Sequence, residues 1–308
     1  MATSSDAPPA PPAGRALHLE AQAAALLAAL LFSTGGMALK AGVFTALQLS
    51  GFRSAIAAAV LAVWARGRLR FSSSVAGAAV AYAATLTLFV SSTRLTTAAA
   101  AIFLQSTAPL FLAVMGPLWL REPLRRSDWM PLGLLAAGLT ACLLGYPAAS
   151  LTAPDPVTGN LLGVASGLSW ACTLAGLRAA SVRDGSSAVV SAVVLGNLLA
   201  AVIALPFAFP LPRGLAPEDL LQLAYLGVIQ VALAYVLLTV AVRHLPAFEV
   251  ALLLLLEPVL NPVWTWWFRG EAPGPWVVAG GAGIVLAAAL RAGAARPVTR
   301  RPPGAPPA

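Results

Sequence analysis

One apolar stretch of the chain combines a carboxyl group, an amide and two prolines. In LEPVLNPVW, Glu257 directly precedes Pro258, and Asn261 directly precedes Pro262. The stretch lies inside Leu245–Phe268, a run that is apolar and long enough to cross a bilayer. A carboxylate at mid-membrane costs at least ~2.5 kcal/mol, so it is usually kept for a function and faces a cavity or a partner. Glu257 and Asn261 are therefore candidates for binding a substrate, and Glu257 for coupling to protons.

The two prolines indicate that this span is broken. A proline has no N–H to donate, so a carbonyl one turn earlier is freed inside the membrane. Broken helices with polar groups at the midplane are typical of transporter binding sites. Pro258 and Pro262 are thus candidates for a helix break or a gate. The alternative is a kinked packing helix with a buried, protonated Glu257.

The same stretch has an earlier copy. With Pro109 aligned to Pro258, residues 94–122 match residues 243–271 without a gap. The start of each half matches as well, Phe32 with Trp170. The chain is therefore predicted to be a duplicated unit, with Pro109 as a third candidate for a break. The first copy has Ala108 in place of Glu257, so an ionisable gate would be asymmetric.

The elements that must position these residues are apolar helices. Of 308 residues, 59% are hydrophobic and 10% charged, which predicts an all-α polytopic membrane protein. Hydropathy predicts ten transmembrane helices, at about 21–39, 43–64, 75–92, 95–120, 129–146, 159–177, 186–209, 219–241, 245–268 and 275–291. The first five-helix repeat is expected at 20–146 and the second at 147–291. Because five is odd, the second repeat is inverted relative to the first.

The basic residues predict the orientation. With both termini in the cytosol, fourteen of the nineteen Lys and Arg residues lie inside and four outside, as the positive-inside rule requires. We therefore expect a multi-pass protein of the plasma (inner) membrane. Residues 1–19 and 292–308 are expected to be disordered cytosolic tails.

Other polar or aromatic residues inside the spans are candidates for contacting a ligand. Arg53, in the second span, needs a carboxylate, carbonyls or water around it, and Glu257 is a possible charge partner. Each of the others could instead pack or hydrogen-bond to a neighbouring helix. These candidates are Phe32, Tyr82, Gln105, Trp170, Gln230 and Tyr235.

Two further acids are read as structural. Glu122 closes the first copy of the repeat, where it could satisfy backbone donors or pair with an arginine. Glu249, one turn inside the ninth span, is read as an interfacial charge exposed to water. The spacing of Gly163 and Gly167, and of Gly280 and Gly283, predicts close helix contacts.

The pattern resembles the drug/metabolite transporter superfamily, EamA type. The motifs are TTAAAAIFLQSTAPLFLAVMGPLWLRE (96–122) and PAFEVALLLLLEPVLNPVWTWWFRGE (246–271), each followed by a helix rich in small residues. The resemblance implies a secondary transporter of small metabolites, often an exporter of amino acids or related compounds. It also implies a central cavity lined by spans of both halves. Its carriers would work by alternating access around a midplane site.

Other classes of function are less well supported by the residues. A membrane enzyme would need a nucleophile with a base, or paired carboxylates; no histidine lies within a span, and Glu257 has no comparably deep acid partner. A channel is expected to show charged rings or a filter loop. We expect no enzymatic activity, no cofactor, no metal and no nucleic acid. The expected partners are a small-molecule substrate and the lipid bilayer, and a homodimer is left open.

Overall fold

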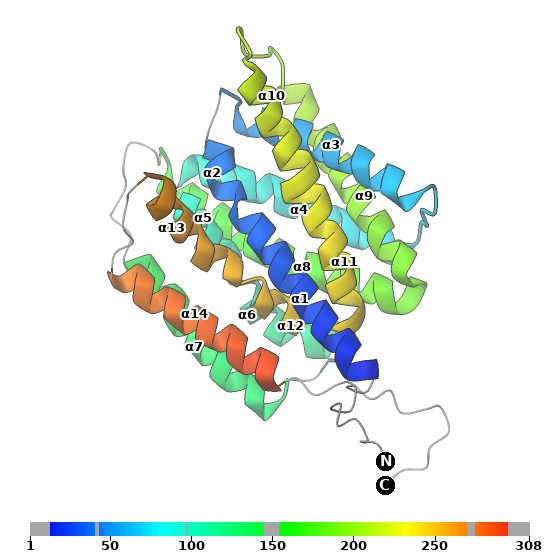
Figure 1. Cartoon of the computed structure of the whole chain (residues 1–308), viewed down its shortest axis with the longest axis vertical. Helices are drawn as coiled ribbons and strands as arrows, with labels where there is room; N and C mark the ends of the chain where they lie inside the picture. Colours follow the sequence, from blue (N-terminus) through cyan, green and yellow to red (C-terminus); the bar gives the residue numbers. More distant parts are fainter. Residues whose placement is uncertain are drawn as a thin grey trace, which may run out of the picture.

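A computed structural model describes residues 13–40, 43–96, 98–122, 124–144, 154–269 and 275–294. Within these ranges every regular element is a helix (Figure 1). The first half contains α1 (Ala13–Ser33), α2 (Gly35–Lys40), α3 (Ala46–Ala65), α4 (Ser73–Leu95), α5 (Ala98–Gln105), α6 (Ala108–Met115), η1 (Gly116–Leu120), η2 (Arg126–Asp128) and α7 (Trp129–Leu144). The second contains α8 (Pro156–Asp184), α9 (Ser186–Ala204), η3 (Leu205–Phe207), α10 (Pro217–Ala224), η4 (Tyr225–Leu233), α11 (Ala234–His244), α12 (Ala247–Leu253), α13 (Leu256–Arg269) and α14 (Pro275–Ala294).

Helices occupy all ten predicted segments, but not all of them meet the criteria for a span. Seven helical stretches of the described chain are long and apolar enough to cross a membrane. Of the other three segments, α7 has only 16 residues, the segment 245–268 is divided into α12 and α13, and the apolar part of α14 is limited to Val278–Leu290. The all-helical membrane fold is confirmed, while the number of ten spanning helices stays a prediction.

The chain is interrupted next to the two matched prolines. Helix α5 ends at Gln105 and α6 begins at Ala108, while α12 ends at Leu253 and α13 begins at Leu256. Because Pro258 has no N–H, the carbonyl of Leu254 accepts a hydrogen bond from the N–H of Glu257 at 3.0 Å instead. The helix is therefore interrupted just before Glu257, which is the second residue of α13.

A glycine on α8 makes room for the first break. A Cβ atom at Gly167 would lie 2.6 Å from Oγ1 of Thr107 and 2.7 Å from the carbonyl oxygen of Leu104. One turn earlier, a Cβ at Gly163 would lie 2.9 Å from Cβ of Leu104. The predicted close contact at this pair of glycines is confirmed, and it presses α8 against the end of α5.

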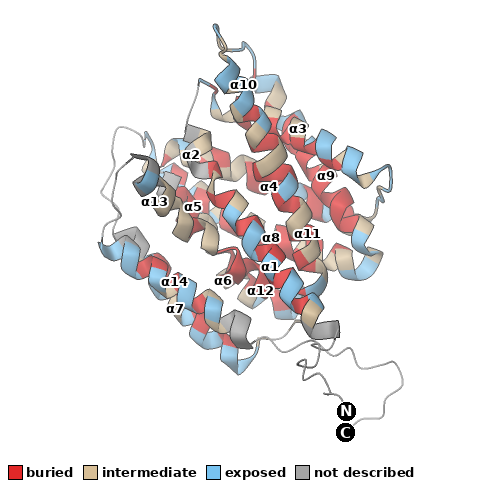
Figure 2. Ribbon diagram, in the orientation of Figure 1, coloured by how far each residue is buried: buried red, intermediate tan, exposed pale blue. Residues whose placement is uncertain are grey.

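Helices α4 and α8 pack against each other at the centre of the molecule, with α9 packed against α4 and α3, whereas α7 and α14 lie side by side at one edge (Figures 1 and 2). The α7–α14 contact is also close, since a Cβ at Gly138 would lie 2.7 Å from the carbonyl oxygen of Gly280. Figure 2 shows buried residues concentrated on the central helices, while pale-blue, exposed positions line the outer helix faces. Many of these exposed side chains are large and apolar, as expected for surfaces in contact with lipid.

The predicted N-terminal tail is wrong over its last residues. Helix α1 begins at Ala13, so residues 13–19 belong to the helix. The segment is rich in alanine and leucine, which favour helix, and His18 is buried against α12 rather than solvated. At the other end, α14 extends to Ala294, so the predicted tail is also wrong at residues 292–294. The remaining predicted tail residues, 1–12 and 295–308, lie outside the described part of the chain.

Candidate functional site

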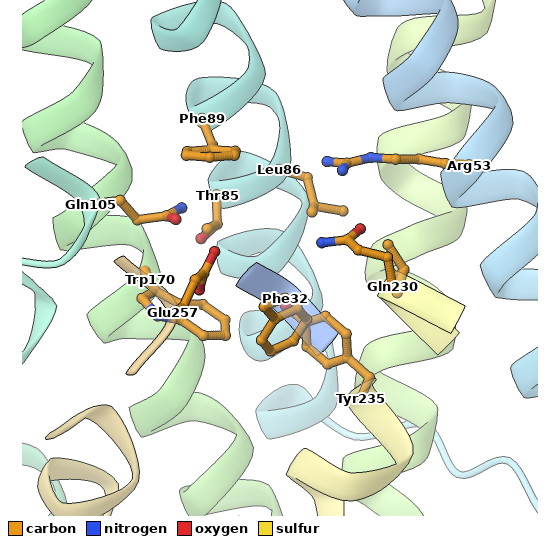
Figure 3. Close-up of a pocket in the computed structure, with 11 residues that line it drawn as sticks. Phe32, Arg53, Thr85, Leu86, Phe89, Gln105, Trp170, Gln230, Tyr235 and Glu257 are labelled. Carbon is orange, nitrogen blue, oxygen red and sulfur yellow. The ribbon is translucent and has the colours of Figure 1, made fainter. Parts of the chain in front are cut away.

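A cavity in the bundle is lined by helices of both halves (Figure 3). It encloses about 470 Å³ of empty space, including some that is open to the outside. Helices α1, α3, α4 and α5 contribute from the first half, and α8, η4, α11 and α13 from the second. The lining residues are Phe32, Arg53, Thr85, Leu86, Phe89, Gln105, Trp170, Gln230, Val231, Tyr235 and Glu257. Seven of these were candidates from the sequence.

Aromatic rings form one wall of the cavity. The ring of Tyr235 contacts Phe32 and Trp170 edge-on, with centroids 5.3 Å and 6.4 Å away. Phe32 and Trp170 are the matched pair of the repeat, so the two halves contribute equivalent aromatic residues to the same wall. Such T-shaped contacts add about 0.5–1.5 kcal/mol beyond the area they bury, which favours this arrangement of the rings.

Glu257 and Gln105 lie together on one side of the cavity (Figure 3). The amide of Gln105 donates a hydrogen bond to Oγ of Ser166 at 2.9 Å, which fixes its direction. Both residues also line a smaller space next to the two helix breaks, where Pro109, Leu254 and Leu255 are among the other lining residues. The carboxyl group therefore lies where the interrupted helices of the two halves adjoin.

Arg53 enters the cavity from the other side (Figure 3). Its side chain is 2% exposed, and its Nε has no hydrogen-bond partner. Among the described residues no ion pair joins Arg53 to Glu257, although both line the same space. Sequence reasoning identified both charges but not their separation.

Three of the predicted site residues are placed differently. Tyr82 is fully buried behind Tyr235, with ring centroids 4.6 Å apart, and donates to Oδ1 of Asn197 at 3.4 Å. Neither Tyr82 nor Asn261 is among the lining residues of the cavity. The helix break predicted at Pro262 is wrong, because the backbone of α13 continues through this residue; its side chain is outside the description. Pro258 is buried at the start of α13.

Four lining residues were missed from the sequence: Thr85, Leu86, Phe89 and Val231. Thr85, Leu86 and Phe89 follow Tyr82 by three, four and seven residues, so they continue along the same face of α4. This helical spacing was the available signal. Val231 follows Gln230 within η4 and had no signal of its own.

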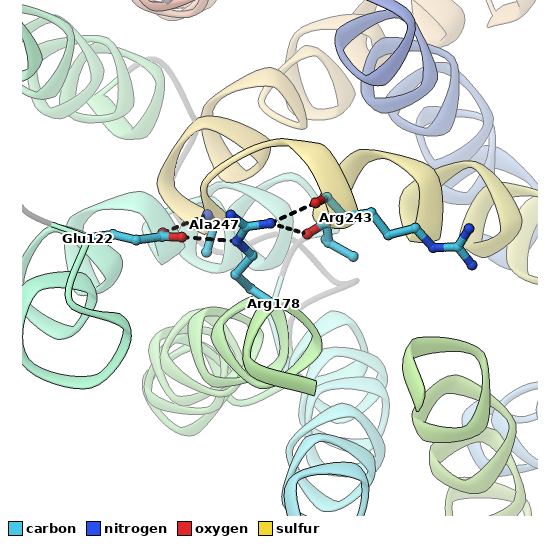
Figure 4. A network of polar contacts seen from close by, with 5 residues as sticks. Glu122, Arg178, Arg243 and Ala247 are labelled. Atoms are coloured by element: carbon cyan, nitrogen blue, oxygen red, sulfur yellow. Dashed lines mark hydrogen bonds and ion pairs between the residues drawn. The ribbon is translucent and has the colours of Figure 1, made fainter. Parts of the chain in front are cut away.

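A polar network holds the start of α12 (Figure 4). Nε of Arg178 on α8 donates to Oε1 of Glu122 at 3.0 Å, and its Nη1 donates to the carbonyl oxygens of Val242 and Arg243 at the end of α11. The other carboxylate oxygen of Glu122 accepts from the N–H of Ala247 at 3.1 Å. The predicted structural role of Glu122 is confirmed: it satisfies a backbone donor and pairs with an arginine.

A second cluster holds the same helix from another side. Oε1 of Glu249 accepts from Nε2 of Gln22 at 2.9 Å and lies 3.2 Å from Nε2 of His18, both on α1. Glu249 is 1% exposed, so its prediction as an exposed interfacial charge is wrong. The reason is tertiary, because α1 extends far enough to cover it. Two clusters thus connect α12 to elements of the first half.

A bundle of apolar helices with two interrupted spans beside a polar cavity is typical of multi-pass membrane transporters. The profile of the EamA-like transporter family matches residues 20–144 and 157–292, so the chain belongs to this family of membrane transporters. The match covers each half separately, and the resemblance inferred from the sequence is confirmed.

A solved crystal structure has a similar fold. It is 23% identical, covers 89% of this chain and 96% of its own, and superposes with a TM-score of 0.71. At this identity the likeness describes the fold alone. No curated protein matches the sequence.

Proposed function

We propose that the protein is a secondary transporter that exports small, amino-acid-like metabolites by alternating access. The observation that carries the proposal is the cavity, whose polar and aromatic lining comes from both halves. A site built between two repeats can be exposed to either side when one repeat rocks against the other. The cavity is therefore the proposed substrate site, and Glu257 the proposed proton-coupling group.

The clusters around α12 are the proposed gate on the cytosolic side. They lie at the end of the bundle where α11 passes into α12, which the positive-inside rule assigns to the cytosol. Both connect α12 to first-half elements through charged groups. Their opening would release α12, the shorter part of the broken span, and expose the cavity inward.

Export and the class of substrate rest on the family alone. We place the protein in the inner membrane with both termini in the cytosol, as the distribution of basic residues predicts. The alternative functions are a channel, because a cavity between helices can also belong to a pore, and an intramembrane enzyme.

Reconstituted protein separates the carrier from the channel. Proteoliposomes loaded with unlabelled amino acids are expected to accumulate the matching external labelled amino acid by exchange, with a saturable rate. In planar bilayers the same preparation is expected to show no unitary currents. Single-channel conductance without saturable exchange would contradict the carrier and indicate a channel.

A further inference from the structure

Two buried polar side chains of the cavity have hydrogen-bonding atoms without partners. Arg53 is 2% exposed and Gln230 is 7% exposed. Nε of Arg53 and Oε1 of Gln230 are buried and make no hydrogen bond. Figure 3 shows the guanidinium and the amide on the same side of the cavity, both directed into it. A guanidinium taken out of water costs several kcal/mol unless a counter-charge and hydrogen bonds compensate for it.

No acid of the described chain supplies that counter-charge. Glu122 pairs with Arg178, and Glu249 pairs with His18. Glu257 lines the same cavity from the other side, but it forms no ion pair with Arg53. The other groups facing Arg53 include the hydroxyl-bearing residue Tyr235, which is neutral when protonated. The guanidinium therefore faces the cavity as an uncompensated positive charge.

The local backbone favours this placement of Gln230. The residue lies in η4, a π-helical stretch, and such stretches are common at functional sites. Gly35 on α2 leaves room for the amide, since a Cβ atom there would lie 2.7 Å from Nε2 of Gln230. The partnerless Oε1 can only accept a hydrogen bond, so Nε2 is the atom of this amide that can donate to a ligand in the cavity.

We propose that Arg53 and Gln230 form an anion-binding subsite that takes the carboxylate of the substrate, opposite Glu257, which takes its ammonium group. A guanidinium offers two parallel N–H donors that match a carboxylate, and the Gln230 amide can add a third. The separation of the two charges across one cavity then selects a zwitterion. This subsite rests on the proposed function and deepens it by naming the two ends of the ligand.

The proposal predicts that Arg53 is needed for ligands with a carboxylate and not for the fold. We would measure thermal unfolding of purified protein with free amino acids, with the corresponding amino-acid amides, and with acetate at constant ionic strength. At least one free amino acid is expected to raise the Tm of the wild type, and its amide, which lacks the carboxylate, is not. Arg53→Gln is expected to weaken the binding of that amino acid about a hundred-fold. Arg53→Lys is expected to weaken it less, since lysine keeps the charge but lacks the two parallel N–H donors of the guanidinium.

Stability without ligand distinguishes binding from a structural role. Because Arg53→Gln removes an uncompensated buried charge, the Tm of the ligand-free variant is expected to be equal to or above that of the wild type. A lower Tm would indicate a structural partner for Arg53 and would overturn the proposal. Arg183→Gln, at an exposed position near the end of α8, is the matched control and is expected to bind as the wild type does.

The outcomes separate this proposal from the proposed function. Equal stabilisation by the acid and its amide, or an unchanged response in Arg53→Gln, would overturn the subsite even if exchange of amino acids is measured. If acetate raises the Tm, amino acids do not, and Arg53→Gln abolishes the effect, Arg53 binds anions but the cavity does not select a zwitterion, which would overturn the proposal. Carboxylate binding that depends on Arg53, with no flux in proteoliposomes, would support the subsite and contradict transport. Stabilisation by neither amino acids nor acetate would overturn the subsite.

Discussion

At the scale of single residues, the site contains two charges with different surroundings. Glu257 is half-buried next to a helix break, while Arg53 is fully buried in a continuous helix. Both line the same cavity without pairing to each other. A ligand that enters between them can change the environment of both at once.

Glu257→Gln tests the proton-coupling role. The substitution keeps the shape and a hydrogen-bonding group, but it can neither titrate nor pair as a charge with an ammonium group. Transport by the variant is therefore expected to be slower and to lose its dependence on pH, while the protein inserts normally. Substrate exchange in proteoliposomes, measured at several pH values, provides the comparison. Glu218→Gln, at an exposed position on α10, is the control. A variant with the wild-type rate and pH profile would reduce Glu257 to a packing residue.

At the scale of elements, the interrupted helices depend on their neighbours. The break between α5 and α6 lies against α8, where Gly167 approaches the backbone of Leu104. The break between α12 and α13 adjoins it through a shared space. Proline alone therefore does not determine the local geometry; the opposing helix must also leave room.

Gly167→Ala is expected to lower the stability of the protein. The added methyl group would have to displace a backbone carbonyl, and overpacking of this kind costs about 1–3 kcal/mol. Gly77→Ala on α4 is a matched control, because nothing lies within 4 Å of the Cβ position. Alanine stabilises a helix by about 0.5–1 kcal/mol relative to glycine, so the Tm of Gly77→Ala is expected to be above that of the wild type. Thermal unfolding in detergent measures both, and equal shifts would contradict the close contact.

The gate around α12 is tested by Glu122→Gln. A hydrogen bond to a charged group contributes about 1.5–3 kcal/mol, so its loss is expected to increase inward opening about ten-fold or more. A reporter cysteine at Ala251, which lines the space between the breaks, can be labelled with an impermeant reagent from the cytosolic side. The background would lack Cys142 and Cys172. Labelling at the parental rate, or an equal increase from both sides, would refute a gate at this position.

At the scale of the whole molecule, the two halves share one cavity and one family profile. Helices of both halves line the cavity. The family profile matches the two halves separately, at residues 20–144 and 157–292. An inverted repeat explains both facts, because two oppositely oriented units placed face to face enclose a site between them.

The inverted topology predicts the sidedness of two positions. Cysteines placed singly at Ser150, outside the described residues, and at Ser186, at the start of α9, are expected to react from opposite sides, external and cytosolic respectively. The reason is that one predicted span, 159–177, lies between the two positions. Impermeant maleimide applied to intact cells and to inverted vesicles measures this. Labelling of both positions from the same side would rule out the inverted repeat.

The sequence by itself determined the features that depend on local chemistry. Apolar length predicted ten segments that are all occupied by helices, and the matched prolines predicted where two of them are interrupted, because a missing N–H acts within one turn. It also identified Glu257, Gln105 and Trp170 as candidates that the structure brings to one cavity. Polar groups are costly in apolar helices wherever those helices pack, so their type alone was informative.

Only the tertiary structure decided which way each helix turns its side chains. Tyr82 and Leu86 share a face of α4, yet Tyr235 covers the tyrosine and leaves the leucine at the cavity. The partners of Glu249 and the isolation of Arg53 depend on residues far away in the chain. Helix rotation and crossing are set by packing between distant segments, which local periodicity does not contain.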